Sequence, residues 1–508
     1  MLINKLLESL PQSAYSATQV LENEEKIGQL KNITMIDLME KAGQAAFRHL
    51  HSEYAMLSHI LVICGKGNNG GDGFVIARLA AERGIQVTVY LCAEKNQLKG
   101  HAKTMYDRLG KNNLNIIEQN ERPLTNEFLG ENQYQLIVDA LFGIGFSGQL
   151  PESLEQLITV VNEHDVPILS IDVPSGLEAS TGHVISRAII AQQTVTFIAV
   201  KQGLLTGQSA NHVGELYLAD LSLGQCFQQN VTTDFSVQGQ HSQPNMPSRN
   251  AACHKGNIGL LLTFGGNQGM PGAIRLASEA ALRTGAALVS VYCHRENHQM
   301  VVHGRPELML ASAADMPLDE HPHFKKAKVL LCGPGLGQNQ WAKDLFTLVV
   351  NSSKPCVLDA DALSLLATTN KKRNDWVLTP HAGEAAKLLS CTIAEVERNR
   401  FSAVKKIVEK YGGICVLKGA GSLIANGENN WINTSGNSGM ATAGMGDVLS
   451  GIIAALLMQL AKPIDAVRLA VQLHGQAADI IKDRQGEVGM LASDLLSELP
   501  YLLNQDNR

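Results

Sequence analysis

Three loops rich in glycine, asparagine and aspartate each follow a short apolar run in the first half of the chain. In the first, CGKGNNGGDG at residues 64–73, Gly65, Gly67 and Gly70 have the G-x-G-x-x-G spacing of a dinucleotide-binding loop. Glycines let the backbone approach a ligand closely, and the free N–H groups of the following helix suit a phosphate. Taken alone the pattern is a weak signal, because Gly-Asn-Asn-Gly is also typical of a simple turn.

The second and third loops add carboxylates and hydroxyls to the first. Asp139 is followed by LFGIGFSGQL, and Asp172 lies in IDVPSG. Because parallel strands end at the same edge of a sheet, we expect the three loops to share one rim, where open α/β sheets bind ligands. Asn69, Asp139 and Ser175 then offer oxygen ligands to a hard cation, and Asp172 can act as a general acid or base. A single aspartate after a strand is usually a helix N-cap, but the three loops together favour a site.

A glycine-rich loop in the second half also opens a helix. It reads Gly444-Met445-Gly446-Asp447 and precedes the apolar run VLSGIIAALL. Small residues before a helix form an anion hole of backbone N–H groups, and Asp447 at its edge can take a proton from an attacking hydroxyl. No G-x-x-x-x-G-K-[ST] motif occurs in the sequence, which argues against a P-loop nucleotide site.

Four shorter motifs accompany this loop. KGAGS at 418–422 follows an apolar run and could hold a nucleotide, and GPGLG at 333–337 is a second flexible loop at a strand end. TPHAGE at 379–384 places His381 and Glu384 where they could touch a substrate and a metal-bound water. We interpret DAD at 359–361 as helix capping rather than as a metal site.

The elements that must position these loops form an alternating pattern. Apolar runs of strand length alternate with helical segments, which predicts an α/β fold with parallel sheets covered on both faces, as two tandem three-layer αβα domains. Helices are expected at 16–30, capped by Ser16 or Thr18, and at 34–50. The polar stretch 226–249 is expected to be a linker between domains at 1–225 and 250–508.

Composition excludes several classes of function. The 508 residues have a formal net charge of −6 and no long Lys/Arg run, so we expect no nucleic-acid partner. The longest apolar stretch, 452–460, is too short to span a membrane, and the first residues lack the features of a signal peptide. Nine scattered cysteines without a C-x-x-C pair fit a reducing compartment, so we expect a cytoplasmic protein without a membrane partner.

The three loops of the first half together resemble the NAD(P)H-hydrate epimerase domain, with a Rossmann-like fold over roughly residues 10–225. The resemblance implies a potassium ion held by Asn69, Asp139 and Ser175. It also implies that Asp172 is the base for epimerisation at the hydrated C6 carbon of the nicotinamide ring. The residues implied to contact the dinucleotide substrate are Asn68, Asn69, Gly70, Gly71, Asp72, Gly143, Ile144, Gly145, Phe146, Ser147, Gly148, Gln149 and Asp172.

The pairing of an anion hole with Asp447 resembles the ribokinase-like superfamily. The motif order GPGLG, LDADAL, LTPHAGE, VLKGAG and GNSGMATAGMGDVLSG resembles its ADP-dependent NAD(P)H-hydrate dehydratase domain, from about residue 250 onward. One departure is visible, because the family would have Thr where Met445 stands. The implied hydrate contacts are Ala273, Gly337, His381 and Asp447. The implied nucleotide contacts are Lys418, Gly419, Ala420, Gly421, Ser422 and Gly446.

These resemblances predict one repair pathway. The first domain would interconvert the R and S hydrates of NADH or NADPH, and the second would use ADP and magnesium to remove water from the S form, with Asp447 as the base. The resemblance also implies that the second domain assembles with copies of itself.

Three alternative functions predict different products or activities. A ribokinase-like kinase of a small vitamin-precursor alcohol would release a stable phosphorylated product. An NAD-dependent dehydrogenase, with Glu94 as the acidic residue after its second strand, would transfer hydride to a carbonyl. A non-catalytic dinucleotide-binding protein would leave Asp172 and Asp447 without a role.

Overall fold

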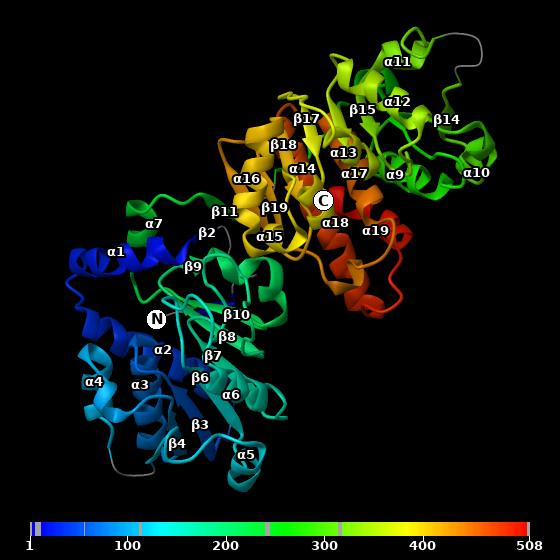
Figure 1. The fold of residues 1–508 in the computed structure, drawn as a ribbon. Helices are drawn as coiled ribbons and strands as arrows, with labels where there is room; N and C mark the ends of the chain where they lie inside the picture. The colour runs from blue at the N-terminus through cyan, green and yellow to red at the C-terminus, as the bar shows by residue number, and fades with distance from the viewer. Residues whose placement is uncertain are drawn as a thin grey trace. The chain divides into compact units, whose positions relative to one another are not determined.

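The computed structural model describes residues 3–5, 12–54, 56–110, 114–238, 244–312 and 317–504. It divides into two compact units, Met1–Ser236 and Val237–Arg508, each built on a sheet covered by helices (Figure 1). The predicted α/β class with two tandem αβα domains is confirmed.

The first unit contains a sheet in which every neighbouring pair is parallel except the antiparallel pair at one edge. Two separate hydrophobic clusters cover its two faces, which makes three layers. The strands in spatial order are β1 (Ile3–Lys5), β10 (Glu215–Ala219), β8 (Gln193–Phe197), β7 (Ile168–Ile171), β6 (Leu136–Ala140), β3 (His59–Cys64), β4 (Gln86–Leu91) and β5 (Leu114–Glu118).

Helices pack on both faces of this sheet. The first face is covered by α2 and α3, whose buried residues include Leu38 and Phe74, and the second by α5 and α6, whose buried residues include Phe128 and Leu157. A short parallel pair, β2 (Gln12–Tyr15) with β9 (Val200–Lys201), lies outside the sheet. The helices are α1 (Ala17–Leu30), α2 (Met35–Glu53), α3 (Asn68–Glu82), α4 (Gly100–Asp107), α5 (Asn126–Asn132), α6 (Glu152–Asn162) and α7 (Gly224–Asn230).

The two helices that precede the sheet begin as their sequences predict. Ser16 caps α1 in a reciprocal capping box with Gln19, and Thr34 caps α2 in the same way with Asp37. Ser16, rather than Thr18, is therefore the N-cap of the first helix.

The segment 226–249 contains more regular structure than a linker. Helix α7 continues to Asn230, and Phe227 is fully buried in the core of the first unit. Strand β11 (Phe235–Gln238) follows, and residues 239–243 lie outside the described residues. Within this polar stretch Phe227 anchors α7 against the first unit, and Phe235 is buried on β11.

The second unit has a sheet that is parallel from β14 to β18 and antiparallel from β18 to β20. Its β18–β19 connection is the KGAGS turn. The strands in spatial order are β14 (Leu308–Leu310), β13 (Leu288–Tyr292), β12 (Leu260–Phe264), β15 (Ala327–Cys332), β16 (Cys356–Leu358), β17 (Trp376–Leu378), β18 (Ile414–Leu417), β19 (Ser422–Ala425) and β20 (Asn430–Asn433).

One large hydrophobic cluster joins this sheet to α9, α17, α18 and α19. The helices of the unit are α8 (Lys255–Ile258), α9 (Pro271–Arg283), α10 (His298–Val302), α11 (Pro322–Lys326), α12 (Gln340–Asn351), α13 (Asp361–Leu366), α14 (Ala382–Leu389), α15 (Ile393–Arg398), α16 (Arg400–Tyr411), α17 (Met445–Leu457), α18 (Pro463–Gln485) and α19 (Leu495–Leu503). Over the ranges described above, the chain has no helix with the length and hydropathy needed to cross a membrane.

Candidate functional site

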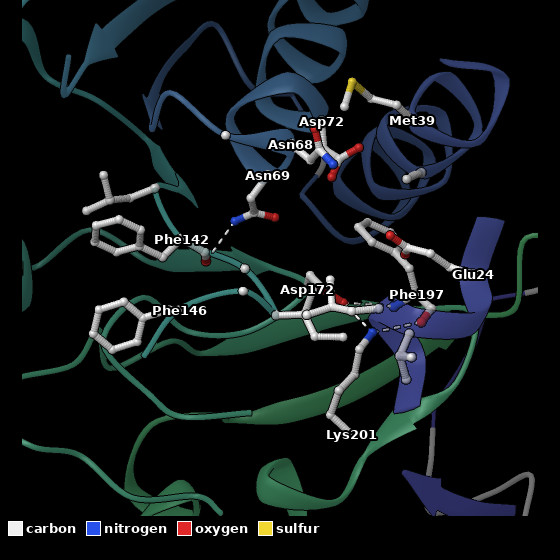
Figure 2. Close-up of a pocket in the computed structure, with 18 of the residues that line it drawn as sticks. Glu24, Met39, Asn68, Asn69, Asp72, Phe142, Phe146, Asp172, Phe197 and Lys201 are labelled. Carbon is white, nitrogen blue, oxygen red and sulfur yellow. Dashed lines mark hydrogen bonds and ion pairs between the residues drawn. The ribbon is translucent and has the colours of Figure 1, made fainter. Parts of the chain in front are cut away.

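A cavity of about 570 Å³ lies in the first unit, where the predicted loops end three parallel strands (Figure 2). The loops after β3, β6 and β7 all contribute to its wall, as expected for the carboxyl ends of an open α/β sheet. Helices α1 and α2 supply further wall residues. The predicted residues that line it are Asn68, Asn69, Asp72, Gly143, Ile144, Gly145, Phe146, Ser147, Gln149 and Asp172.

Three predicted substrate-binding glycines do not line this cavity. A Cβ at Gly70 would lie 1.9 Å from the Gly65 carbonyl oxygen, and one at Gly71 would lie 2.5 Å from the Met39 sulfur. These two glycines therefore allow α3 to begin close to β3 and α2. Gly148 has a φ of +91°, a left-handed conformation that favours glycine, and stands beside the wall rather than in it.

The three predicted potassium ligands are linked by short contacts. The Asn69 amide donates to the Phe142 carbonyl oxygen at 2.8 Å. The Ser175 hydroxyl donates to Asp139 Oδ1 at 2.5 Å, and its oxygen lies 3.3 Å from the same Phe142 oxygen. Within the described part of the chain, Asn69 Oδ1 is buried and has no hydrogen-bond partner. An unpartnered amide oxygen beside a buried carboxylate fits a bound hard cation.

Burial acts strongly on Asp139. It raises the pKa of this carboxyl group, while hydrogen bonds from Ser175, Ser170 and the Leu141 amide lower it. Ser170 Oγ and the Ser175 amide each donate to Oδ2 at 2.8 Å. A cation at this position would favour the charged form of Asp139, because its charge replaces the hydration that burial removes.

Asp172 enters the cavity in a strained backbone conformation. Its φ is +66°, and that of Ile198, another wall residue, is +65°. A residue with a Cβ rarely adopts this conformation, and such strain is concentrated at functional sites. It turns the Asp172 side chain toward Lys201 on β9, whose ammonium nitrogen lies 2.5 Å from Asp172 Oδ1 (Figure 2).

Three acidic side chains share the cavity with this lysine. Burial, followed by the charge on Asp172, raises the pKa of Glu24 to about 7. The same two causes raise the pKa of Asp72 well above its ordinary value. Neither Lys201 nor Glu24 belongs to a recognisable motif, and the analysis of the sequence missed both. Glu94 is not among the wall residues, so the feature that favoured a dehydrogenase is not part of the site.

In the second unit, the predicted motifs meet at the carboxyl ends of β15 to β18. Lys418 Nζ lies 2.9 Å from Asp359 Oδ1 and 3.7 Å from Glu384 Oε2. A Cβ at Gly446 would lie 3.1 Å from the same nitrogen. Glycine at 446 therefore allows the start of α17 to approach the lysine closely. The interpretation of DAD as capping is wrong for Asp359, which instead accepts hydrogen bonds from Lys418 and Thr379.

The acidic groups around Lys418 also shift the pKa of Asp447. Burial, then the charge on Asp359, raises it to about 7, although Lys418 lowers it. Lys418 stays charged because Asp359 and Glu384 raise its pKa against the opposing effect of burial. Asp447 stands in the first turn of α17, after Gly444 with a φ of +90°.

The GPGLG loop lies beside helix α9. A Cβ at Gly335 would lie 3.4 Å from Ala273 Cβ, and the Gly337 amide donates to Asp361 Oδ2 at 2.8 Å. Buried Asn267, which the sequence analysis missed, donates to the Leu336 oxygen and supports this loop. These contacts bring Ala273 and Gly337 to the same edge of the sheet.

His381, which is predicted to contact the hydrate, also caps a helix. It caps α14, where its Nδ1 accepts from the Gly383 amide at 2.9 Å and its Nε2 lies 3.5 Å from Glu384 Oε1. Its side chain is 59% exposed, so Nε2 can still reach a ligand.

Two features position the KGAGS loop, which is predicted to bind the nucleotide, and helix α17. Gly419, with a φ of +147°, leaves no room for a Cβ, because Arg400 Nη2 would lie 2.7 Å away. Arg400 is almost fully buried and donates hydrogen bonds to the Leu417 and Lys418 carbonyl oxygens, so it holds the backbone at the start of the KGAGS loop in place. The Met445 side chain is buried in the core, which explains an apolar residue there.

Comparison with known proteins identifies the family of the chain. A family profile described as NAD(P)H-hydrate dehydratase matches residues 261–501, and one described as YjeF-related protein N-terminus matches residues 35–203. A bifunctional NAD(P)H-hydrate repair enzyme of Coxiella burnetii is 43% identical over 96% of this chain and 99% of its own. One from Escherichia coli is 41% identical over 98% of this chain and 95% of its own.

Two solved structures are similar to about half of the chain. An ADP/ATP-dependent NAD(P)H-hydrate dehydratase from Bacillus subtilis, co-crystallized with ATP/Mg2+, is 30% identical, with a TM-score of 0.47 over 51% of this chain and 94% of that one. A ribokinase-like superfamily protein from Enterococcus faecalis is 29% identical, with a TM-score of 0.46 over 51% and 92%. The full-length relatives confirm the family predicted from the motifs, and the chain belongs to the bifunctional NAD(P)H-hydrate repair enzymes, which join an epimerase to an ADP-dependent dehydratase.

Proposed function

We propose that the two activities of the family are divided between the two sites described above. The cavity of the first unit interconverts the R and S hydrates of NADH or NADPH at C6, and the site around Asp447 removes water from the S hydrate with ADP. The observation that carries this proposal is that each site has a candidate base beside a lysine: Asp172 is ion-paired with Lys201, and the charge of Lys418 acts on Asp447.

In the epimerase site, Asp172 takes a proton during the exchange of the C6 hydroxyl group. Lys201 holds Oδ1 of this carboxylate, which keeps the side chain in one orientation. Asn69, Asp139 and Ser175 would hold a potassium ion, which would supply positive charge near the bound dinucleotide. Asn68, Asp72 and the loop 143–149 would bind the dinucleotide, because Asn68, Asp72 and every residue of the loop except Gly148 line the cavity.

In the dehydratase site, Asp447 deprotonates the C6 hydroxyl, which then attacks the terminal phosphate of ADP. The backbone N–H groups of Gly444–Gly446 stabilise the charge that develops on the phosphate. AMP leaves in this step. Phosphate then leaves C6, assisted by the electron pair of the ring nitrogen, and C5 gives a proton to water as the C5–C6 double bond returns. This route replaces hydroxide, a poor leaving group, with phosphate.

The remaining motifs would bind the two substrates. Lys418–Ser422 and Gly446 would contact the AMP moiety, and Ala273, Gly337 and His381 would contact the hydrate. Over the described residues, no cluster of three or more His, Cys, Asp or Glu side chains could hold a metal ion. Magnesium would therefore reach this site on the nucleotide phosphates.

A single assay tests both assignments. The purified chain is mixed with hydrated NADH, ADP and magnesium, and the near-ultraviolet absorbance of reduced nicotinamide is followed. Recovery that requires ADP and consumes both epimers supports the proposal. Recovery of the S epimer alone contradicts the epimerase assignment, and a stable phosphorylated product would instead favour a small-alcohol kinase.

Two variants then locate the activities. Asp172→Ala should stop rescue of the R hydrate only, and Asp447→Asn should stop dehydration while epimerisation continues. Equal loss on both epimers with Asp172→Ala, or normal turnover with Asp447→Asn, would contradict the role of that residue.

A further inference from the structure

A carboxylate outside every motif lines the epimerase cavity. Glu24 lies on α1 and reaches the cavity with its neighbours Val20 and Leu21. Figure 2 shows it entering from α1, whereas Asp172 enters from the loop after β7. In the part of the chain that the structure describes, its carboxylate has no hydrogen-bond or ion-pair partner. The acidic residues beside it in the sequence, Glu22 and Glu25, are exposed and do not line the cavity.

Epimerisation at C6, which rests here on the proposed function, needs proton transfer on two faces of one carbon. The hydroxyl group leaves from one face as water, after it gains a proton. The ring nitrogen supplies the electron pair that stabilises the cation left at C6. A second water adds to the other face and loses a proton. One carboxylate held in place by a lysine serves only one of these faces.

We propose that Glu24 is the second acid–base residue of the epimerase site and acts on the face of C6 opposite to Asp172. In one direction the protonated Glu24 gives its proton to the leaving hydroxyl group, the C6–O bond breaks, and water departs. Water then bonds to C6 from the other face and gives a proton to the Asp172 carboxylate. After the turnover Glu24 takes up a proton from solvent water and Asp172 releases one to solvent water, which restores the starting protonation states. In the reverse direction the two residues exchange roles.

The charged groups around Glu24 are consistent with this role. It faces Asp172, Lys201 and Asp72 across the cavity, and its own helix contributes Glu25. Helix α7, which packs on α1, carries no charged residue. The pKa of Glu24 is raised to about 7, by burial and then by Asp172, so both protonation states are populated near neutral pH. Burial, followed by the charges on Asp172 and Glu24, also raises the pKa of Asp72 well above its ordinary value.

The test uses the full-length protein, in which dehydration of the S hydrate serves as an internal control. Glu24→Gln should lower the rate of R-hydrate consumption by about 10²-fold or more, while S-hydrate dehydration is unchanged. Glu22→Gln, on the same helix but exposed, should behave as wild type. Glu24→Asp, which keeps a carboxylate, should recover part of the lost rate.

A pH profile separates proton transfer from a structural role. Wild-type kcat/KM for the R hydrate should change with a midpoint near pH 7, and Glu24→Gln should lose this dependence. Epimerisation by Glu24→Gln within twofold of wild type would overturn the proposal. So would equal losses in Glu24→Gln and Glu24→Asp with the wild-type pH profile. Absence of epimerisation by the wild-type protein would instead contradict the proposed function.

Discussion

Lys201 and Asp172 form an ion pair, with 2.5 Å between Nζ and Oδ1, in the wall of the first cavity. Lys201 is 1% exposed and also donates to Thr196 Oγ1 and to the Phe197 carbonyl oxygen. The three acceptors use all three hydrogens of the ammonium group. The lysine therefore orients Asp172 and supplies the opposite charge that burial of this carboxylate requires.

Removal of this lysine should affect both stability and epimerisation. Lys201→Met leaves Asp172 buried without its counter-charge, which should lower the free energy of unfolding of the first unit by about 3–5 kcal/mol. The rate of epimerisation should fall by at least about 100-fold, because Asp172 is no longer oriented. Thermal unfolding and R-hydrate consumption measure the two effects. Lys26→Met, an exposed change on α1, is the control, and normal epimerisation by Lys201→Met would contradict the role of Lys201.

The potassium site proposed at Asn69, Asp139 and Ser175 predicts an ion-specific effect on the first unit. Exchange of potassium for tetramethylammonium, which is too large for the site, should lower the epimerisation rate at least about tenfold. Potassium should also raise the melting temperature of the first unit, since it binds the folded state only. Asn69→Ala should abolish that rise in melting temperature, whereas Asn115→Ala, an exposed change on β5, should preserve it. An equal response to potassium in both variants would argue against this ligand set.

The raised pKa of Asp447 predicts how dehydration depends on pH. Below its pKa of about 7 this carboxyl group is protonated and cannot act as a base. The value of kcat/KM for the S hydrate should therefore fall about tenfold per pH unit below 7 and level off above it. An aspartate with its ordinary pKa of about 3.9 would give a flat profile between about pH 5.5 and 8. A flat profile for the wild-type protein would show that another group is the base.

Gly446→Ala should reduce activity without unfolding the protein. The new Cβ would lie 3.1 Å from Lys418 Nζ, the end of a flexible side chain, which can move away at little cost to stability. This movement weakens the contact with Asp359 and misplaces the charge beside the nucleotide. We expect about a 10- to 100-fold loss of kcat/KM for ADP and an unchanged melting temperature. Gly130→Ala, where no atom lies within 4 Å of the added Cβ, is the control, and full ADP turnover by Gly446→Ala would count against this role.

Much of the fold could be predicted because its signals are local. Buried parallel strands are continuous apolar runs, so β3, β4, β6, β7, β8 and most strands of the second sheet were recognisable. Strands β5 and β10 were not, because they lie toward the edges of the sheet and carry polar residues. Helix α7 was hidden in a polar stretch, since one buried phenylalanine decides its place.

The sequence by itself determined the family, the two α/β domains and the loops at the strand ends, because glycine spacing and apolar runs act over a few residues. Only the tertiary structure decided which side chains join those loops. Glu24 precedes the first motif, Lys201 follows the last motif of its unit, and Arg400 lies in a helix with no motif. Each reaches its site through packing of elements distant along the chain, and such long-range contacts leave no periodic signal in the sequence.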